Sequence, residues 1–228
     1  MCGRFVRSRP AQAWADLLGA EPVAALPPSW NVSPSQPVLA ARRRRDGVLE
    51  LVALRWGLVP PWARAPGGRG LINARAETVA VRPAFREAFR RRRCLVAADG
   101  FYEWVRGPAG ARRPWLFRLR GGAPFAFAGL WARREGPDGT VVETCAILTT
   151  EANGLVRPVH ARMPVILAEP EAMARWLEGG PGEAGRLRAL LRPLAPERME
   201  GWPVGSAVND PRRDGPALAA PLAEGARP

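Results

Sequence analysis

The chain has 228 residues, of which 47% are hydrophobic and 24% are charged, and its formal net charge is +13. A chain of this length can bury roughly 70% of its unfolded surface, which is enough for a self-sufficient core. The large positive charge indicates a polyanionic partner, most simply nucleic acid, because neutralised phosphates release counterions. All 34 basic residues are arginine, so the bias of a GC-rich genome is an alternative explanation for part of this excess.

Several classes of protein are excluded by the remaining composition. Cys2, Cys94 and Cys145 are odd in number and widely spaced, which argues against a disulfide scaffold. His160 is the only histidine, so a zinc site of the usual type is not expected. The sequence has no apolar run approaching the roughly 18 residues of a membrane span and no signal peptide. We therefore expect a soluble, cytoplasmic protein with reduced thiols, no metal and no cofactor.

The predicted elements follow from apolar spacing and from the positions of glycine and proline. Residues 10–19 are expected to form a short helix, and residues 27–34 a proline-rich loop. Residues 83–93 are expected to form a second helix, because Phe85 and Phe89 lie four residues apart. The remaining predicted elements, in chain order, are strands at 48–56, 94–98, 101–105, 115–119, 125–131 and 140–149, an extended segment at 164–167, helices at 171–177 and 183–191, and a last strand at 204–208.

Many strands in hairpin order with a few helices between them favour an α+β fold. We expect a single domain with an antiparallel, barrel-like β core and peripheral helices. The domain is expected to span residues 2–220, followed by a C-terminal tail at 221–228.

The N-terminal residues carry the most specific chemical pattern. Removal of Met1 would leave Cys2 with both a thiol and an α-amine, whose unperturbed pKa values are about 8.5 and roughly 7.7–8.0. Such an aminothiol can capture an aldehyde first as an imine and then as a thiazolidine ring. Because the chain has no lysine, no other amine could form this imine. The alternative is that cysteine occupies position 2 by chance.

Two titratable side chains could assist this chemistry. Glu103 lies between Tyr102 and Trp104, and partial burial would raise its pKa toward a range useful for proton transfer. His160 could donate a proton to a sugar ring oxygen as the ring opens. The alternatives are a glutamate on the solvent face of a strand, opposite its aromatic neighbours, and a structural histidine.

Other polar and aromatic residues suit a nucleic-acid strand. Asn73 and Arg75 would share one face of an extended segment and could hold a phosphate or sugar oxygen, and Arg4 lies two residues from Cys2. Surface salt bridges are the alternative for these residues. The loop residues Trp30, Pro34 and Trp62 could stack on bases or wedge between them. The arginine runs 42–45 and 90–93 could follow the phosphates. For the run 42–45, a solvated charged face in a hairpin turn is equally expected.

An ordered set of motifs resembles the SRAP family, the SOS-response-associated peptidase family. The motifs span nearly the whole chain in family order: Met1-Cys2-Gly3-Arg4-Phe5, Asn31-Val32-Ser33-Pro34, Arg55-Trp56-Gly57-Leu58-Val59-Pro60, Asn73-Ala74-Arg75-Ala76-Glu77-Thr78, Asp99-Gly100-Phe101-Tyr102-Glu103-Trp104, Ala146-Ile147-Leu148-Thr149-Thr150, His160-Ala161-Arg162-Met163-Pro164-Val165-Ile166-Leu167 and Ala207-Val208-Asn209.

The resemblance implies a protein that senses abasic sites in single-stranded DNA and links itself covalently to them. It implies that Cys2 forms a thiazolidine with the sugar aldehyde, with Glu103, His160 and Asn73 assisting and weak AP-lyase activity from the imine. It also implies a monomer that needs no metal and associates with the nucleoid when bound to DNA. The residues implied to bind DNA are Arg4, Asn31, Pro34, Trp62, Asn73, Arg75 and Arg162.

The sequence departs from the family pattern at two positions and leaves other functions open. Ala97 occupies a position that is often proline, and Ala161 a position where aspartate is common; the second change would affect the pKa or orientation of His160. One alternative is a cysteine-type peptidase or N-terminal-nucleophile hydrolase that removes its own Met1. More distant alternatives are a glutamine amidotransferase and a non-enzymatic module that binds single strands.

Overall fold

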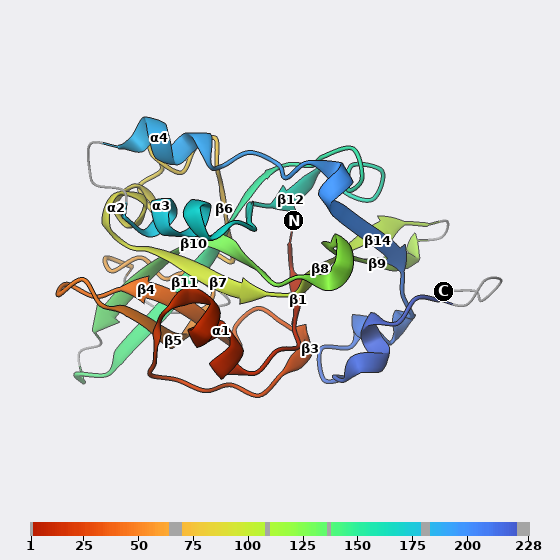
Figure 1. Ribbon diagram of the computed structural model, residues 1–228, viewed down its shortest axis with the longest axis horizontal. Coiled ribbons are helices and arrows are strands. Elements are labelled where there is room, and N and C mark those ends of the chain that lie inside the picture. Colours follow the sequence, from red (N-terminus) through yellow and green to blue (C-terminus); the bar gives the residue numbers. More distant parts are fainter. Residues whose placement is uncertain (1, 64–69, 108–109, 136–137, 179–182, 223–228) are drawn as a thin grey trace.

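A five-stranded closed β-barrel forms the centre of the molecule (Figure 1). The computed structural model describes residues 2–63, 70–107, 110–135, 138–178 and 183–222. Four antiparallel pairings connect the barrel strands, and a parallel pairing of β11 with β5, through Thr144 with Arg55 and Cys145 with Trp56, closes the ring. In ring order the strands are β11 (Val141–Glu151), β10 (Phe125–Glu135), β7 (Arg93–Ala98), β4 (Pro37–Arg43) and β5 (Leu49–Trp56). The expected barrel-like core is confirmed, with one parallel seam.

A second, antiparallel sheet lies beside the barrel and contains the N-terminal strand. Its order is β14 (Met199–Pro203), β9 (Arg112–Leu119), β8 (Gly100–Arg106), β1 (Arg4–Arg7) and β3 (Ser29–Val32). Short strands extend the barrel sheet: β2 (Glu21–Pro22), β6 (Asn73–Arg75), β12 (Arg162–Pro164) and β13 (Ile166–Leu167). Because β7 leads directly into β8, the barrel and the second sheet are joined at this point.

Side chains of alternating residues separate the barrel interior from its outer face, as the two-residue period of a strand requires. Val38, Val96 and Phe127 belong to a buried cluster that also includes residues of the second sheet, whereas their neighbours Leu39 and Leu95 pack against the helices. Cys2 and Phe5 belong to the interior cluster. The N-terminus therefore packs with the core of the barrel.

Four α-helices cover the outer face of the barrel: α1 (Ala11–Leu18), α2 (Arg86–Arg91), α3 (Pro170–Glu178) and α4 (Ala184–Ala189). Trp14, Phe89 and Trp176 are their largest fully buried side chains. Figure 1 shows α2, α3 and α4 grouped on one side. All four helices lie where the sequence predicts them, with ends that differ by a few residues. Within the described ranges, no helix is long and apolar enough to cross a membrane.

Two local expectations are wrong. The last strand ends at Pro203, and the expected strand at 204–208 is replaced by the 3₁₀ turn η4 (Ser206–Asn209). Val204 and Val208 are both fully buried, and the turn places both in the core without the alternation of a strand. The expected loop at 27–34 contains the edge strand β3, whose flanking prolines are compatible with an edge position.

Further 3₁₀ turns within the described ranges are η2 (Arg120–Gly122), η3 (Pro196–Arg198) and η5 (Pro216–Ala219). In the expected C-terminal tail, Pro221 forms a bridge with Val204, so the ordered part of the chain extends into it. Residues 223–228 of that tail lie outside the described residues.

Gly129 of β10 provides a test of packing in the barrel interior. A Cβ atom at this position would lie 2.8 Å from Cys94 Sγ and 3.1 Å from Val96 Cγ2. We expect Gly129→Ala to lower the free energy of unfolding by about 1–3 kcal/mol, because the barrel must expand to admit it. Gly154→Ala is the control, since nothing lies within 4 Å of its Cβ position. Urea unfolding midpoints that are equal for the two variants would contradict this packing.

Candidate functional site

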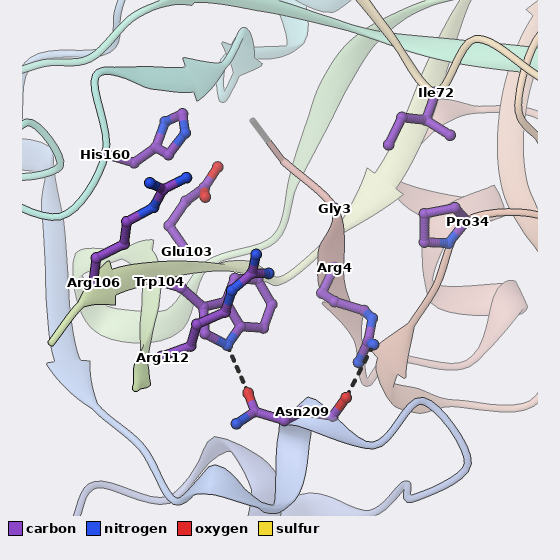
Figure 2. A pocket seen from close by; sticks show the side chains of 10 residues that line it. All are labelled: Gly3, Arg4, Pro34, Ile72, Glu103, Trp104, Arg106, Arg112, His160 and Asn209. Carbon is purple, nitrogen blue, oxygen red and sulfur yellow. Dashed lines mark hydrogen bonds between the residues drawn. The ribbon is translucent and has the colours of Figure 1, made fainter. Parts of the chain in front are cut away.

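A cavity of about 610 Å³ lies beside the N-terminal strand β1 and the hairpin β8–β9. Figure 2 shows His160, Glu103 and Arg106 on one side of the N-terminal strand and Pro34 and Ile72 on the other. The residues that line the cavity are Gly3, Arg4, Pro34, Ile72, Glu103, Trp104, Arg106, Arg112, His160 and Asn209.

Cys2 lies next to this cavity and is fully buried. The side-chain amide of Asn73 donates a hydrogen bond of 2.9 Å to the Cys2 carbonyl, which fixes the backbone. The thiol lies 3.9 Å from the Arg4 carbonyl. Burial raises the pKa of the Cys2 thiol well above its ordinary value, and the nearby charge of Glu103 raises it further. The thiol is therefore neutral in this state, which suits addition to a preformed imine better than direct attack as a thiolate.

Glu103 is a buried carboxyl group, 3% exposed, on strand β8. Burial raises the pKa of this carboxyl group, and the electrostatic interaction with His160 opposes the shift. The alternative that Glu103 faces solvent is wrong. Alternation does place it opposite Tyr102 and Trp104, but its own face of the strand is buried as well.

His160 is oriented by the backbone of a neighbouring residue. Its Nδ1 lies 2.9 Å from the Arg162 backbone nitrogen and 3.0 Å from the Arg162 carbonyl. When Nδ1 accepts the Arg162 N–H, the proton resides on Nε2, and the ring has a donor to offer at the cavity. The backbone of Arg162 thus orients the ring, although Ala161 offers no carboxylate beside it.

Asn73 and Arg75 lie two residues apart on the extended strand β6, which pairs with β11. Asn73 is half-buried, and its Oδ1 is a buried acceptor with no hydrogen-bond partner in the described part of the chain. Arg75 is exposed and is not among the residues that line the cavity. The structure therefore brings Asn73, but not Arg75, into contact with Cys2.

Arg4 and Asn31 are joined to the C-terminal turn η4. Arg4 Nη1 lies 2.7 Å from both Asn31 Oδ1 and the Val208 carbonyl. The buried amide of Asn31 donates to the carbonyls of Asp210, at 3.0 Å, and Arg213, at 2.8 Å. Arg4 lines the cavity, whereas Asn31 supports it from behind.

The other expected DNA-binding residues are dispersed. Pro34 lines the cavity, while Trp62 is 67% exposed on a separate loop. Arg162 forms two hydrogen bonds with the carboxylate of Glu77, at 2.7 and 3.1 Å, and does not line the cavity.

The two arginine runs contain structural members. Arg42 bonds to Glu50 at 2.6 Å and to Glu143 at 2.8 Å. Arg93 is buried and donates to the Trp176 carbonyl at 2.6 Å.

Besides Gly3 and Ile72, sequence reasoning missed four polar or aromatic lining residues, namely Trp104, Arg106, Arg112 and Asn209. Trp104 Nε1 donates to Asn209 Oδ1 at 2.7 Å (Figure 2). Arg106 and Arg112 lie on neighbouring strands of a hairpin. The two strands predicted on either side of the turn after Gly107 form a hairpin, and this order of elements could have indicated that Arg106 and Arg112 lie opposite each other.

The fold and this site define a small barrel protein whose N-terminal cysteine is enclosed beside a polar cavity. The sequence matches the family described as SOS response associated peptidase (SRAP) over residues 1–211. The chain belongs to this family.

Similar proteins cover nearly the whole chain. Abasic site processing protein YoqW of Bacillus subtilis (strain 168) is 39% identical over 223 residues, which are 96% of this chain and 98% of that protein. Abasic site processing protein HMCES of Mus musculus is 29% identical, over 85% of this chain and 65% of that protein. A crystal structure from Bacteroides thetaiotaomicron has a TM-score of 0.84 at 25% identity and covers 97% of this chain and 100% of its own.

The raised pKa of Glu103 gives a testable link between stability and pH. Ionisation of Glu103 is less favourable in the folded protein than in the unfolded chain, so it lowers the free energy of unfolding. This loss of stability is fully present above the pKa of Glu103 in the folded protein, and it is absent below the pKa of the unfolded chain, near 4.5. We expect Glu103→Gln to increase the free energy of unfolding at pH 7, with a difference that shrinks as the pH falls toward 4.

Glu77→Gln is the control with the opposite sign. Burial raises the pKa of Glu77, but the hydrogen bond and charge of Arg162, a backbone hydrogen bond and the charge of Arg75 together outweigh burial, so the pKa is lowered. This variant should be less stable than the parent at pH 7, and the loss should vanish in acid. Urea unfolding from pH 4 to 8 measures both, and a destabilised Glu103→Gln at pH 7 would refute the assignment.

Proposed function

We propose that this protein processes abasic sites in single-stranded DNA by capturing the sugar aldehyde covalently at Cys2. The observation that carries this proposal is the enclosure of Cys2 beside a cavity lined by Glu103, His160 and arginine side chains. The names of the relatives YoqW and HMCES, abasic site processing proteins, support the substrate. The net charge of +13 favours a phosphate-bearing partner.

The capture begins with an amine. Hydrolysis of the Met1–Cys2 peptide bond consumes one water and frees the Cys2 α-amine. As the abasic sugar opens to its aldehyde, His160 Nε2–H donates a proton to the ring oxygen, and the proton lost by the C1 hydroxyl returns to His160, so the imidazole stays neutral. The amine attacks C1 of the aldehyde, Glu103 accepts a proton from the nitrogen, and loss of water gives the imine.

The neutral thiol completes the ring. Cys2 Sγ forms a bond to C1 of the imine, the C=N double bond becomes a single bond, and the thiol proton is transferred to the nitrogen. Amine, thiol and aldehyde thus give a thiazolidine and one water. Closure removes the imine, which is the species open to β-elimination of the strand, so only weak lyase activity is expected.

A hydrolase role is favoured only for the removal of Met1. The family description contains the word peptidase, and Glu103 lies close enough to act electrostatically on Cys2. Burial and a raised thiol pKa make Cys2 a poor nucleophile toward peptides in trans. Processing of its own N-terminus is therefore the peptidase reaction that this site suits.

The proposal predicts a covalent adduct at Cys2. We expect the parent protein, incubated with a single-stranded oligonucleotide carrying one abasic site, to form a heat-stable conjugate that lacks Met1 and maps to Cys2 by mass spectrometry. Cys2→Ala should form none. Cys2→Ser retains an amine without the thiol, so it should give an imine that borohydride traps, with more strand cleavage.

An oligonucleotide with an intact base is the control for the aldehyde. A Cys2→Ala variant that forms the heat-stable conjugate as efficiently as the parent would refute the mechanism. A parent protein with a free Cys2 terminus that forms none would refute covalent capture.

A further inference from the structure

The hairpin β8–β9 carries two arginines to the cavity. Arg106 and Arg112 are direct register partners on these antiparallel strands, so their side chains leave the same face of the hairpin. Both are exposed, and both line the cavity that contains Glu103 and His160. Figure 2 shows Arg106 beside these two residues and Arg112 beside Trp104.

This pairing of like charges is unfavourable in the free protein. Two guanidinium groups directly opposite each other on adjacent strands repel. Within the described ranges, neither side chain forms an ion pair or a hydrogen bond. The repulsion is therefore not relieved by a carboxylate of the described chain.

Two other cross-strand arginines in this protein face glutamate and form ion pairs with it. Arg42 is the register partner of Glu50 and bonds to it at 2.6 Å. Arg118 is the register partner of Glu200 and bonds to it at 2.8 Å. By contrast, Arg106 and Arg112 face each other at the cavity and have no carboxylate partner within the described ranges, so an anion from outside the chain could bind between them.

The other polar groups of the cavity specify what kind of anion fits. Arg4 already donates to Asn31 and to the Val208 carbonyl, so its donors are partly used. Arg106 and Arg112 offer complete guanidinium forks, which match the oxygens of a phosphate. A sugar that reaches Cys2 within a strand carries a phosphodiester on each side, one of which must pass close to this wall.

We propose that Arg106 and Arg112 form a clamp for one phosphodiester adjacent to the sugar that reaches Cys2. This inference rests on the proposed function and identifies the residues that select an aldehyde within a nucleic-acid strand over a free aldehyde. The clamp is a positioning device, because it holds the backbone while the chemistry takes place at Cys2 and Glu103.

The test separates phosphate binding from covalent capture. Binding is measured for a single-stranded oligonucleotide that carries a tetrahydrofuran abasic analogue, which has no aldehyde and cannot react. The variants are Arg106→Gln, Arg112→Gln and the double substitution. Arg113→Gln is the matched control, since it removes the same charge from the same strand at an exposed residue that does not line the cavity.

We expect the double variant to bind about tenfold more weakly near 0.1 M salt, and the slope of log affinity against log salt to become less steep by about 0.7. Arg113→Gln should keep the parental slope. The melting temperature of the double variant should equal or exceed that of the parent, because a repulsion has been removed. An unchanged slope, or an equal loss for Arg113→Gln, would overturn the clamp.

A neutral methylphosphonate placed at one linkage at a time locates the phosphate. At the contacted linkage it should weaken binding to the parent about tenfold and leave binding to the double variant unchanged. If every linkage weakens both proteins equally, the clamp does not exist. Because this assay uses no aldehyde, failure of covalent capture leaves its result intact, and the reverse also holds.

Discussion

The packing of the N-terminal strand at one end of the barrel determines the rest of the site. Phe5 makes edge contacts with Trp56 and Phe127, with ring centroids 5.3 and 5.5 Å apart, and these two side chains belong to the barrel interior. The far end of strand β4 is held instead by Arg42, whose guanidinium lies 4.2 Å from the Trp131 ring centroid. Because Phe5 is fixed in the core, the backbone of Cys2 has little conformational freedom, and the hydrogen bond from Asn73 to the Cys2 carbonyl completes its positioning.

This burial has a chemical consequence that the burial of an ordinary core cysteine would not have. Removal from water disfavours the charged forms of the thiol and of Glu103 together, and the pKa of each is raised. In the proposed capture, a neutral thiol would not compete with the amine for the aldehyde, so the imine would form first and the ring would close second. The same desolvation of Glu103 lowers the stability of the fold near neutral pH, so the features proposed to make the site reactive also make the protein less stable.

The sequence predicted four of the five barrel strands and the candidates nearest Cys2, but it predicted neither β4 nor the pairings between distant segments. Strand β5 and strand β7 follow from local apolar runs bounded by turn residues. Strand β3 was not predicted, because prolines flank it and because it is held by pairing with β1 and by side chains distant in the sequence. Asn31 is a polar residue of the kind that binds DNA, but in the fold it holds the C-terminal turn through a hydrogen bond to a backbone carbonyl 179 residues away in the sequence. Such contacts leave no local signal.

The same limit applies to the charge of the protein. A net charge of +13 says nothing about where a polyanion would bind. Arg42 and Arg162 are neutralised by glutamates, and Arg93 is bonded to backbone carbonyls in the core. The hairpin arginines acquire their significance from strand register, which places Arg106 and Arg112 directly opposite each other. The pairing of the strands therefore decides which arginines are left for a polyanion, and the net charge of the chain does not identify them.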